Sequence, residues 1–145
     1  MRFFSHDASQ RKTFIRKVMK LMVVEDSPLV RQRIIEMLSA RIPEHSLLEA
    51  DSVETAIALA IAHHPEIVLL DLCLEGGHGF EVLKAIESKC EVIHILVMAL
   101  VPTEQHKKRA LQYGASYFFD KVKDYNNIIE VITGLVGRPY MNSNL

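Results

Sequence analysis

Two uninterrupted apolar segments, each ending in carboxylates, limit most strongly what this chain can fold into. Residues 21–24 (Leu-Met-Val-Val) run directly into Glu25 and Asp26, and residues 67–70 (Ile-Val-Leu-Leu) run into Asp71. Continuous apolar runs of this length are typical of strands that are buried on both faces of a parallel sheet. Because parallel strands end at one edge, we expect these acids to meet where open α/β sheets bind ligands.

Three carboxylates crowded at one sheet edge need a cation. Each negative charge raises the pKa of its neighbours unless a positive charge is shared among them. Hard divalent ions such as Mg²⁺ prefer oxygen ligands and keep several waters. The sequence therefore predicts an Mg²⁺ site at Glu25, Asp26 and Asp71, with a phosphate group as its companion ligand.

Strand and helix patterns alternate along the rest of the chain. Short strands are also expected at 46–50, 92–98 and 115–119. Apolar residues at helical spacing predict helices at about 28–40, from a capping box at 51–54 to 64, through 80–86, at 103–112 and from 124 to 136. With 145 residues the chain suits one domain. The predicted fold is a doubly wound α/β domain, a five-stranded parallel sheet with helices on both faces.

Composition is that of an ordinary water-soluble protein. The chain is 49% hydrophobic and 24% charged, with a formal charge of -1. No apolar run is long enough to cross a membrane, and residues 1–7 lack the apolar stretch of a signal peptide, so we predict a cytoplasmic location without membrane contact. Cys73 and Cys90 form no C-x-x-C pair and are expected to be buried or half-buried free thiols.

Charge is distributed unevenly along the chain. Residues 1–20 contain six basic groups and one acid, a net of +5, which leaves -6 for residues 21–145. We expect a basic N-terminal arm at 1–19, a domain at 20–137 and a short polar tail at 138–145. The arm is interpreted as a loosely docked extension, with binding to an acidic surface as the alternative. Direct DNA binding is not expected.

Three motifs, in order and each at a predicted strand end, resemble the receiver domain of bacterial two-component response regulators. They are Glu25-Asp26 with Ser27-Pro28, the segment 67–74 with Gly79 eight residues beyond Asp71, and Gly-Ala-Ser-Tyr-Phe-Phe-Asp-Lys at 114–121. The likeness covers about residues 20–136. It implies the strand order 2-1-3-4-5 of flavodoxin and of the chemotaxis regulator.

The resemblance also implies roles for individual residues. Asp71 matches the phospho-acceptor, and Lys121 matches the lysine that pairs with the phosphoryl oxygens. Asp26 matches the principal Mg²⁺ ligand, Glu25 its neighbour, and the backbone carbonyl of Cys73 a further ligand.

The partners implied by the resemblance are proteins of a phosphorelay. A sensor histidine kinase, a histidine phosphotransfer protein or a small phosphodonor would supply the phosphate, and a downstream protein of unknown identity would receive the signal. A homodimer through helix four, strand five and helix five is possible in such domains. The chain would not be an enzyme, apart from catalysing its own phosphorylation and dephosphorylation.

Departures from the family pattern concern the switching residues. Ala99 stands where the family usually has Thr or Ser, so the phosphorylated state would lose a charge-assisted hydrogen bond of about 1.5–3 kcal/mol. Leu100 is bulky where a small residue is usual, and it could narrow access to the site. Phe118 occupies the position of the switch aromatic residue without a phenol group. Glu75 replaces a common proline.

Two alternative functions follow from the sequence. Ala99, Leu100 and Glu75 favour a pseudo-receiver, a constitutive protein-binding module in which phosphorylation is vestigial. A flavodoxin-like nucleotide binder is disfavoured, because no Gly-rich or hydroxyl-rich phosphate loop follows the first strand. The spacing of the histidines at 63, 64, 78 and 94 is not that of metal ligands, so solvated or core roles are expected. The basic run 107–109 is interpreted as a solvated helix face, with an acidic partner as the alternative.

Overall fold

The computed structural model describes residues 19–43, 46–74 and 77–136. Apart from Met19, the predicted basic arm lies outside these ranges, as do the predicted tail and Glu75. The assignments made for those residues stay predictions.

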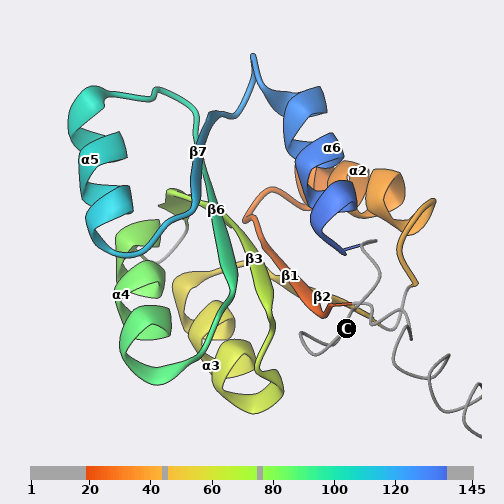
Figure 1. Cartoon of the computed structure of the whole chain (residues 1–145), viewed down its shortest axis with the longest axis horizontal. Helices are drawn as coiled ribbons and strands as arrows, with labels where there is room; N and C mark the ends of the chain where they lie inside the picture. The colour runs from red at the N-terminus through yellow and green to blue at the C-terminus, as the bar shows by residue number, and fades with distance from the viewer. Residues whose placement is uncertain (1–18, 44–45, 75–76, 137–145) are drawn as a thin grey trace, which may run out of the picture.

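A five-stranded parallel sheet forms the centre of the domain (Figure 1). Its strands are β1 (Leu21–Val24), β2 (Leu47–Ala50), β3 (Ile67–Asp71), β6 (His94–Ala99) and β7 (Tyr117–Asp120). Their spatial order is β2-β1-β3-β6-β7, which confirms the predicted order 2-1-3-4-5. Val24 pairs with Leu70, and Asp71 pairs with Met98, so the ends of β1, β3 and β6 lie side by side.

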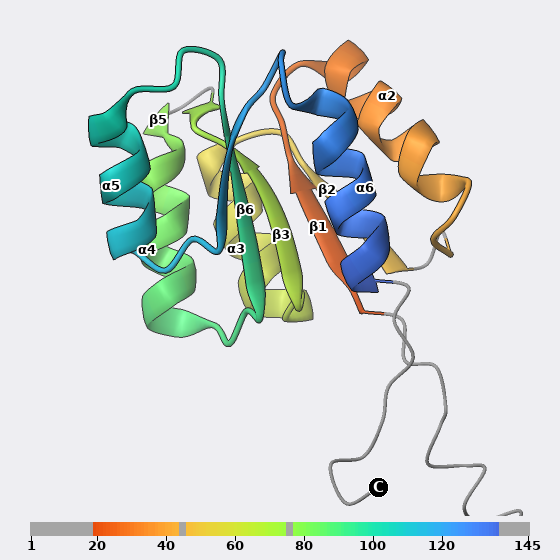
Figure 2. The same cartoon turned by 45° about the horizontal axis from the view of Figure 1, so that its top comes forward.

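Helices cover both faces of the sheet, as predicted (Figure 2). They are α2 (Pro28–Ser39), α3 (Val53–His63), α4 (Gly79–Lys89), α5 (Glu104–Gln112) and α6 (Tyr125–Val136). Alternate strand residues point to opposite faces. Leu21 and Val23 therefore pack in the cluster under α2 and α6, whereas Met22 and Val24 pack in the cluster under α3, α4 and α5. None of the helices in the described ranges has the length and apolar character to cross a membrane.

Side-chain caps fix where two of these helices begin. The Ser27 hydroxyl accepts a hydrogen bond from the Val30 N–H at 3.3 Å, and Pro28 opens α2, as its sequence predicts. The capping box of α3 is shifted by one residue from the predicted 51–54, because Ser52 adopts the extended N-cap conformation and pairs with Thr55. The prediction that this box spans 51–54 is therefore wrong.

A short antiparallel hairpin follows Asp71 and was not predicted from the sequence. It consists of β4 (Cys73–Leu74) and β5 (Gly77–His78), with Cys73 opposite His78. Two-residue strands are too short to show any periodicity, so the sequence gives no signal for them. The hairpin brings the start of α4 back to the end of β3, since the Gly79 N–H donates to the Leu72 carbonyl at 2.8 Å.

Candidate functional site

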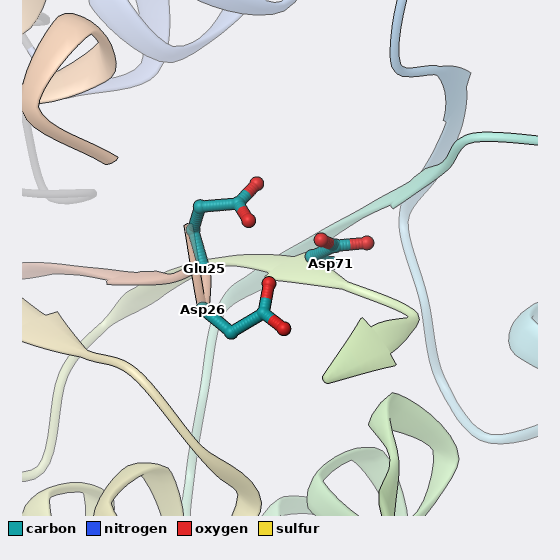
Figure 3. A group of neighbouring side chains, drawn as sticks. All are labelled: Glu25, Asp26 and Asp71. Carbon is teal, nitrogen blue, oxygen red and sulfur yellow. The ribbon is translucent and has the colours of Figure 1, made fainter. Parts of the chain in front are cut away.

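Three carboxylates gather at the carboxyl edge of the sheet (Figure 3). Glu25 and Asp26 follow β1, and Asp71 is the last residue of β3. One carboxylate oxygen from each lies within 4.8 Å of the other two. Glu25 and Asp71 are almost fully buried, and Asp26 is half-buried. The convergence predicted from the two strand endings is therefore confirmed.

The ammonium group of Lys121 lies between the two buried acids. Its Nζ atom is 2.6 Å from Glu25 Oε1 and 2.8 Å from Asp71 Oδ2. Burial alone would lower the pKa of Lys121, but the hydrogen bonds and charges of Asp71 and Glu25 outweigh burial and raise that pKa. The two acids therefore favour the charged form of the Lys121 ammonium, which is directed at both carboxylates.

The turn after β7 holds Lys121 in this position. The Lys121 N–H donates to the Ala99 carbonyl at 2.9 Å, which continues the pairing of β7 with β6. Asp120 Oδ1 accepts the N–H groups of Val122 and Lys123, both at 2.9 Å, and these bonds lower the pKa of Asp120. The backbone around Lys121 is thus fixed on both sides.

Glu25 has an environment that suits a metal ligand. Its Oε2 atom accepts the Ser27 N–H at 3.1 Å. Burial raises the pKa of Glu25 despite the contacts with Lys121 and Ser27 that lower it, and the charge of Asp71 raises it further. In the described part of the chain, the buried Oε1 atom has Lys121 as its single partner. An under-coordinated carboxylate oxygen beside two more carboxylates fits a hard divalent cation.

Arg31 supports the acidic site, and the sequence gives no signal for it. Its Nη1 atom donates to the Glu25 carbonyl at 2.7 Å, and its Nε atom pairs with Glu49 Oε1 at 3.1 Å. The guanidinium group thereby links the end of β1 to β2. From sequence alone, an arginine in the first turn of a polar helix is expected to be solvated. Its partners cannot be identified there, because they lie on other elements.

The remaining predicted site residues lie after β3, at the end of β6 and in β7. The Cys73 N–H donates to Asp71 Oδ1 at 3.0 Å. Both cysteines are free, but the Cys73 side chain is exposed, so the prediction of burial is wrong for Cys73 and holds for the half-buried Cys90. Ala99 is buried as the last residue of β6, and no hydroxyl is present there. Leu100, next in the chain, is 59% exposed. Phe118 is half-buried in β7 and packs against the cluster under α3, α4 and α5.

Leu100 lies between two cavities that open at this edge. One cavity, of about 430 Å³, is bounded by residues of α2, by Lys121 and Val122, and by Tyr125 at the start of α6. The other, of about 280 Å³, opens beside Ala99 and includes His78 and His106. Among the histidines considered in sequence, those at 63, 64 and 78 are exposed and that at 94 is half-buried. His106 was not singled out by any spacing.

The model of the response regulator receiver domain matches residues 21–133. The chain belongs to this family. The sheet, the acidic cluster and all of the helices except the last three residues of α6 lie within the matched range. Receiver domains are signalling modules that interact with histidine kinases or phosphotransfer proteins, so the chain is consistent with phosphorelay signalling.

Individual relatives agree with this assignment. The Fimbriae Z protein of Salmonella typhimurium is 30% identical over 116 residues, which cover 80% of this chain and 55% of that protein. Protein PilH of Pseudomonas aeruginosa is 24% identical, with 81% of this chain and 97% of PilH covered. The chain spans about half the length of several curated relatives that it matches.

Solved receiver structures share the fold. The signal receiver domain of NarL from Mycobacterium tuberculosis is 29% identical and has a TM-score of 0.69, with 85% of this chain and 99% of that chain covered. The chemotaxis protein CheY4 of Vibrio cholerae has a TM-score of 0.70 at 21% identity, with 82% and 98% covered. The acids of this receiver domain are positioned as in the metal site of the family.

Proposed function

We propose that this receiver domain accepts a phosphoryl group on Asp71 in an Mg²⁺-dependent reaction and passes the signal on through protein contacts. The donor would be a sensor histidine kinase, a histidine phosphotransfer protein or a small phosphodonor. One observation carries the proposal: the buried Asp71 carboxylate lies in contact with the Lys121 ammonium, at 2.8 Å, and within 4.8 Å of two further carboxylates.

The chemistry requires a carboxylate nucleophile and neutralisation of negative charge. A carboxylate oxygen of Asp71 would attack phosphorus, forming an acyl phosphate while the bond from phosphorus to the donor breaks and the electron pair leaves with the donor. Glu25, Asp26, Asp71 and the carbonyl of Cys73 would hold Mg²⁺, which would neutralise charge on the phosphoryl oxygens when bound. Lys121 would move its ammonium from the carboxylates to a phosphoryl oxygen and add a second positive charge.

We also propose the bounds of the domain and its location in the cell. We assign residues 20–137 to the receiver, with a cytoplasmic location, as its membership of a phosphorelay family suggests. Helix four, strand five and helix five of the prediction correspond to α5, β7 and α6. That surface is our candidate for output or homodimer contacts, since every residue of α5 except Ala110 is exposed. The basic run 107–109 lies on it.

The absent hydroxyl at Ala99 favours the pseudo-receiver as a second candidate. Calorimetric titration with beryllofluoride, a phosphoryl analogue, separates the two functions. A phosphorylatable receiver should bind it in the presence of Mg²⁺ and lose the binding when the metal is removed by a chelator. A folded protein that binds Mg²⁺ but no beryllofluoride would favour constitutive partner binding.

Ala99→Thr should increase transmission of the phosphoryl signal through β7. In wild type, we expect Mg²⁺ and beryllofluoride to leave the Phe118 rotamer populations and the amide shifts of α6 nearly unchanged. The reason is that position 99 has no hydroxyl that could form a hydrogen bond with the ligand and move toward it. The threonine should restore a bias of about 1.5–3 kcal/mol between conformations. Chemical-shift maps of both proteins, with Mg²⁺ alone and with beryllofluoride added, measure the effect.

Ala99→Val is the matched control for that experiment. Valine has nearly the shape of threonine but lacks the hydroxyl, so it separates polarity from crowding at a buried position. The valine variant should respond like wild type. An equally large response of α6 in wild type, Ala99→Val and Ala99→Thr would show that transmission does not depend on this hydroxyl.

A further inference from the structure

The cavity beside Ala99 adjoins the candidate phosphorylation site. Its volume is about 280 Å³, and its walls include Leu72 and Cys73, the two residues that follow Asp71. Ala99 forms another wall and follows Met98, the residue that pairs with Asp71 across the sheet. A phosphoryl group on Asp71 would therefore have this space next to it.

Two imidazoles provide the N–H groups among the side chains that line this cavity. His78 is the N-cap residue of α4, and its backbone N–H donates to Glu81 Oε1 at 3.2 Å. His106 lies in the first turn of α5, with its backbone N–H donating to the Thr103 hydroxyl at 3.1 Å. The other lining side chains are apolar or, in Cys73, a thiol. These two imidazoles are thus the strong side-chain donors available to an anion that enters the cavity.

Contacts with α4 hold the ring of His106 at the cavity wall. Its centroid is 6.1 Å from that of Phe80, with the ring planes tilted by 55°. Phe80 is buried, and the guanidinium carbon of Arg109 lies 4.4 Å from its ring centroid. No hydrogen bond is formed by the His106 ring nitrogens within the described residues. The ring is therefore positioned by packing while its N–H remains available.

We propose that His106 takes over the role of the absent hydroxyl, with its imidazole N–H donating to an oxygen of the phosphoryl group on Asp71. The contact would draw the first turn of α5 toward the site. A neutral imidazole already carries one N–H, so the contact requires no change of protonation. This inference rests on the proposed phosphorylation of Asp71 and adds the residue that would contact the phosphoryl group.

The character of α5 favours such a response. Among its nine residues only Ala110 is buried, so little packing opposes a small displacement. Lys107, Lys108 and Arg109 follow His106 and make the helix surface positive, which attracts a phosphoryl dianion. The route of the signal is then from Asp71 to α5 through His106, without a requirement for movement of Phe118.

Histidine-ring NMR of the whole chain tests the assignment. With Mg²⁺ present, beryllofluoride should shift the His106 ring resonances together with the amides of the first turn of α5. The same addition to Asp71→Asn should leave them unchanged. An unshifted His106 ring, in a sample whose Lys121 resonances do respond, would overturn the role of His106 while leaving the proposed function intact. Unshifted Lys121 resonances would overturn both.

Affinity measurements provide the second readout. His106→Ala should weaken beryllofluoride binding about tenfold, the effect of losing one hydrogen bond to a charged group. His106→Gln keeps an N–H donor and should recover part of that loss. His78→Ala removes the other imidazole that lines the cavity and should bind beryllofluoride within about twofold of wild type. Loss of affinity in His78→Ala alone, or equal affinity in all four proteins, would contradict the proposal.

Discussion

Asp71→Asn is expected to abolish phosphoryl labelling of the chain by acetyl phosphate and by the proposed sensor kinase. An amide oxygen is a poor nucleophile and cannot form a stable acyl phosphate, so asparagine at this position cannot accept the phosphoryl group. Although the position is only 1% exposed, asparagine has nearly the shape of aspartate, so the fold should persist. Intact-mass spectrometry after incubation with Mg²⁺ and acetyl phosphate measures the label directly.

Controls for this experiment come from the same sheet edge. Asp26→Asn should weaken Mg²⁺ binding and reduce labelling, and a chelator should suppress labelling of wild type. Asp51→Asn removes a carboxylate that follows β2 but lies outside the cluster of Glu25, Asp26 and Asp71, and labelling should remain normal. Equal labelling of wild type and Asp71→Asn would mean that the phosphate enters elsewhere.

Much of the acidic site could be predicted because it depends on strand direction alone. Once 21–24 and 67–70 are identified as neighbouring parallel strands, the residues that follow them must share an edge. The positions of Glu25, Asp26 and Asp71 then require no knowledge of the helices. Lys121 was found by a different route, through its resemblance to a motif. Its contact with Asp71 depends on the place of β7 in the sheet and on the turn at Asp120.

Contacts between side chains on separate elements could not be predicted in this way. Arg31 reaches Glu25 and Glu49, and His106 packs on Phe80, but neither belongs to a periodic pattern or a motif. Such residues have specific partners only after the surrounding helices have docked. The hairpin of β4 and β5 could not be predicted for a related reason, because its pairing depends on how the chain folds back toward Asp71.

Gly79 was identified from the sequence by its place in a motif, but the sequence does not show the physical reason why a glycine is needed there. A Cβ atom at this position would lie 2.6 Å from the Asp71 carbonyl oxygen and 2.7 Å from the Leu72 Cα atom. Both neighbours belong to the backbone, so neither can turn aside as a flexible side chain would. The requirement here is close approach of α4 to the end of β3.

Gly79→Ala should therefore destabilise the domain by about 2–4 kcal/mol, because the start of α4 must move away from β3. The shift would also strain the Gly79 N–H bond to the Leu72 carbonyl, next to Asp71, so phosphoryl labelling should fall as well. Urea denaturation measures the free energy of unfolding.

Gly134→Ala is the matched control, since a Cβ atom at this exposed position in α6 would meet nothing within 4 Å. Alanine is the better helix former, so this variant should be more stable than wild type by about 0.5–1 kcal/mol. The two glycine substitutions should thus change stability in opposite directions. If Gly79→Ala unfolds at the same urea concentration as wild type, then α4 tolerates displacement, and its docking against β3 does not fix the geometry around Asp71.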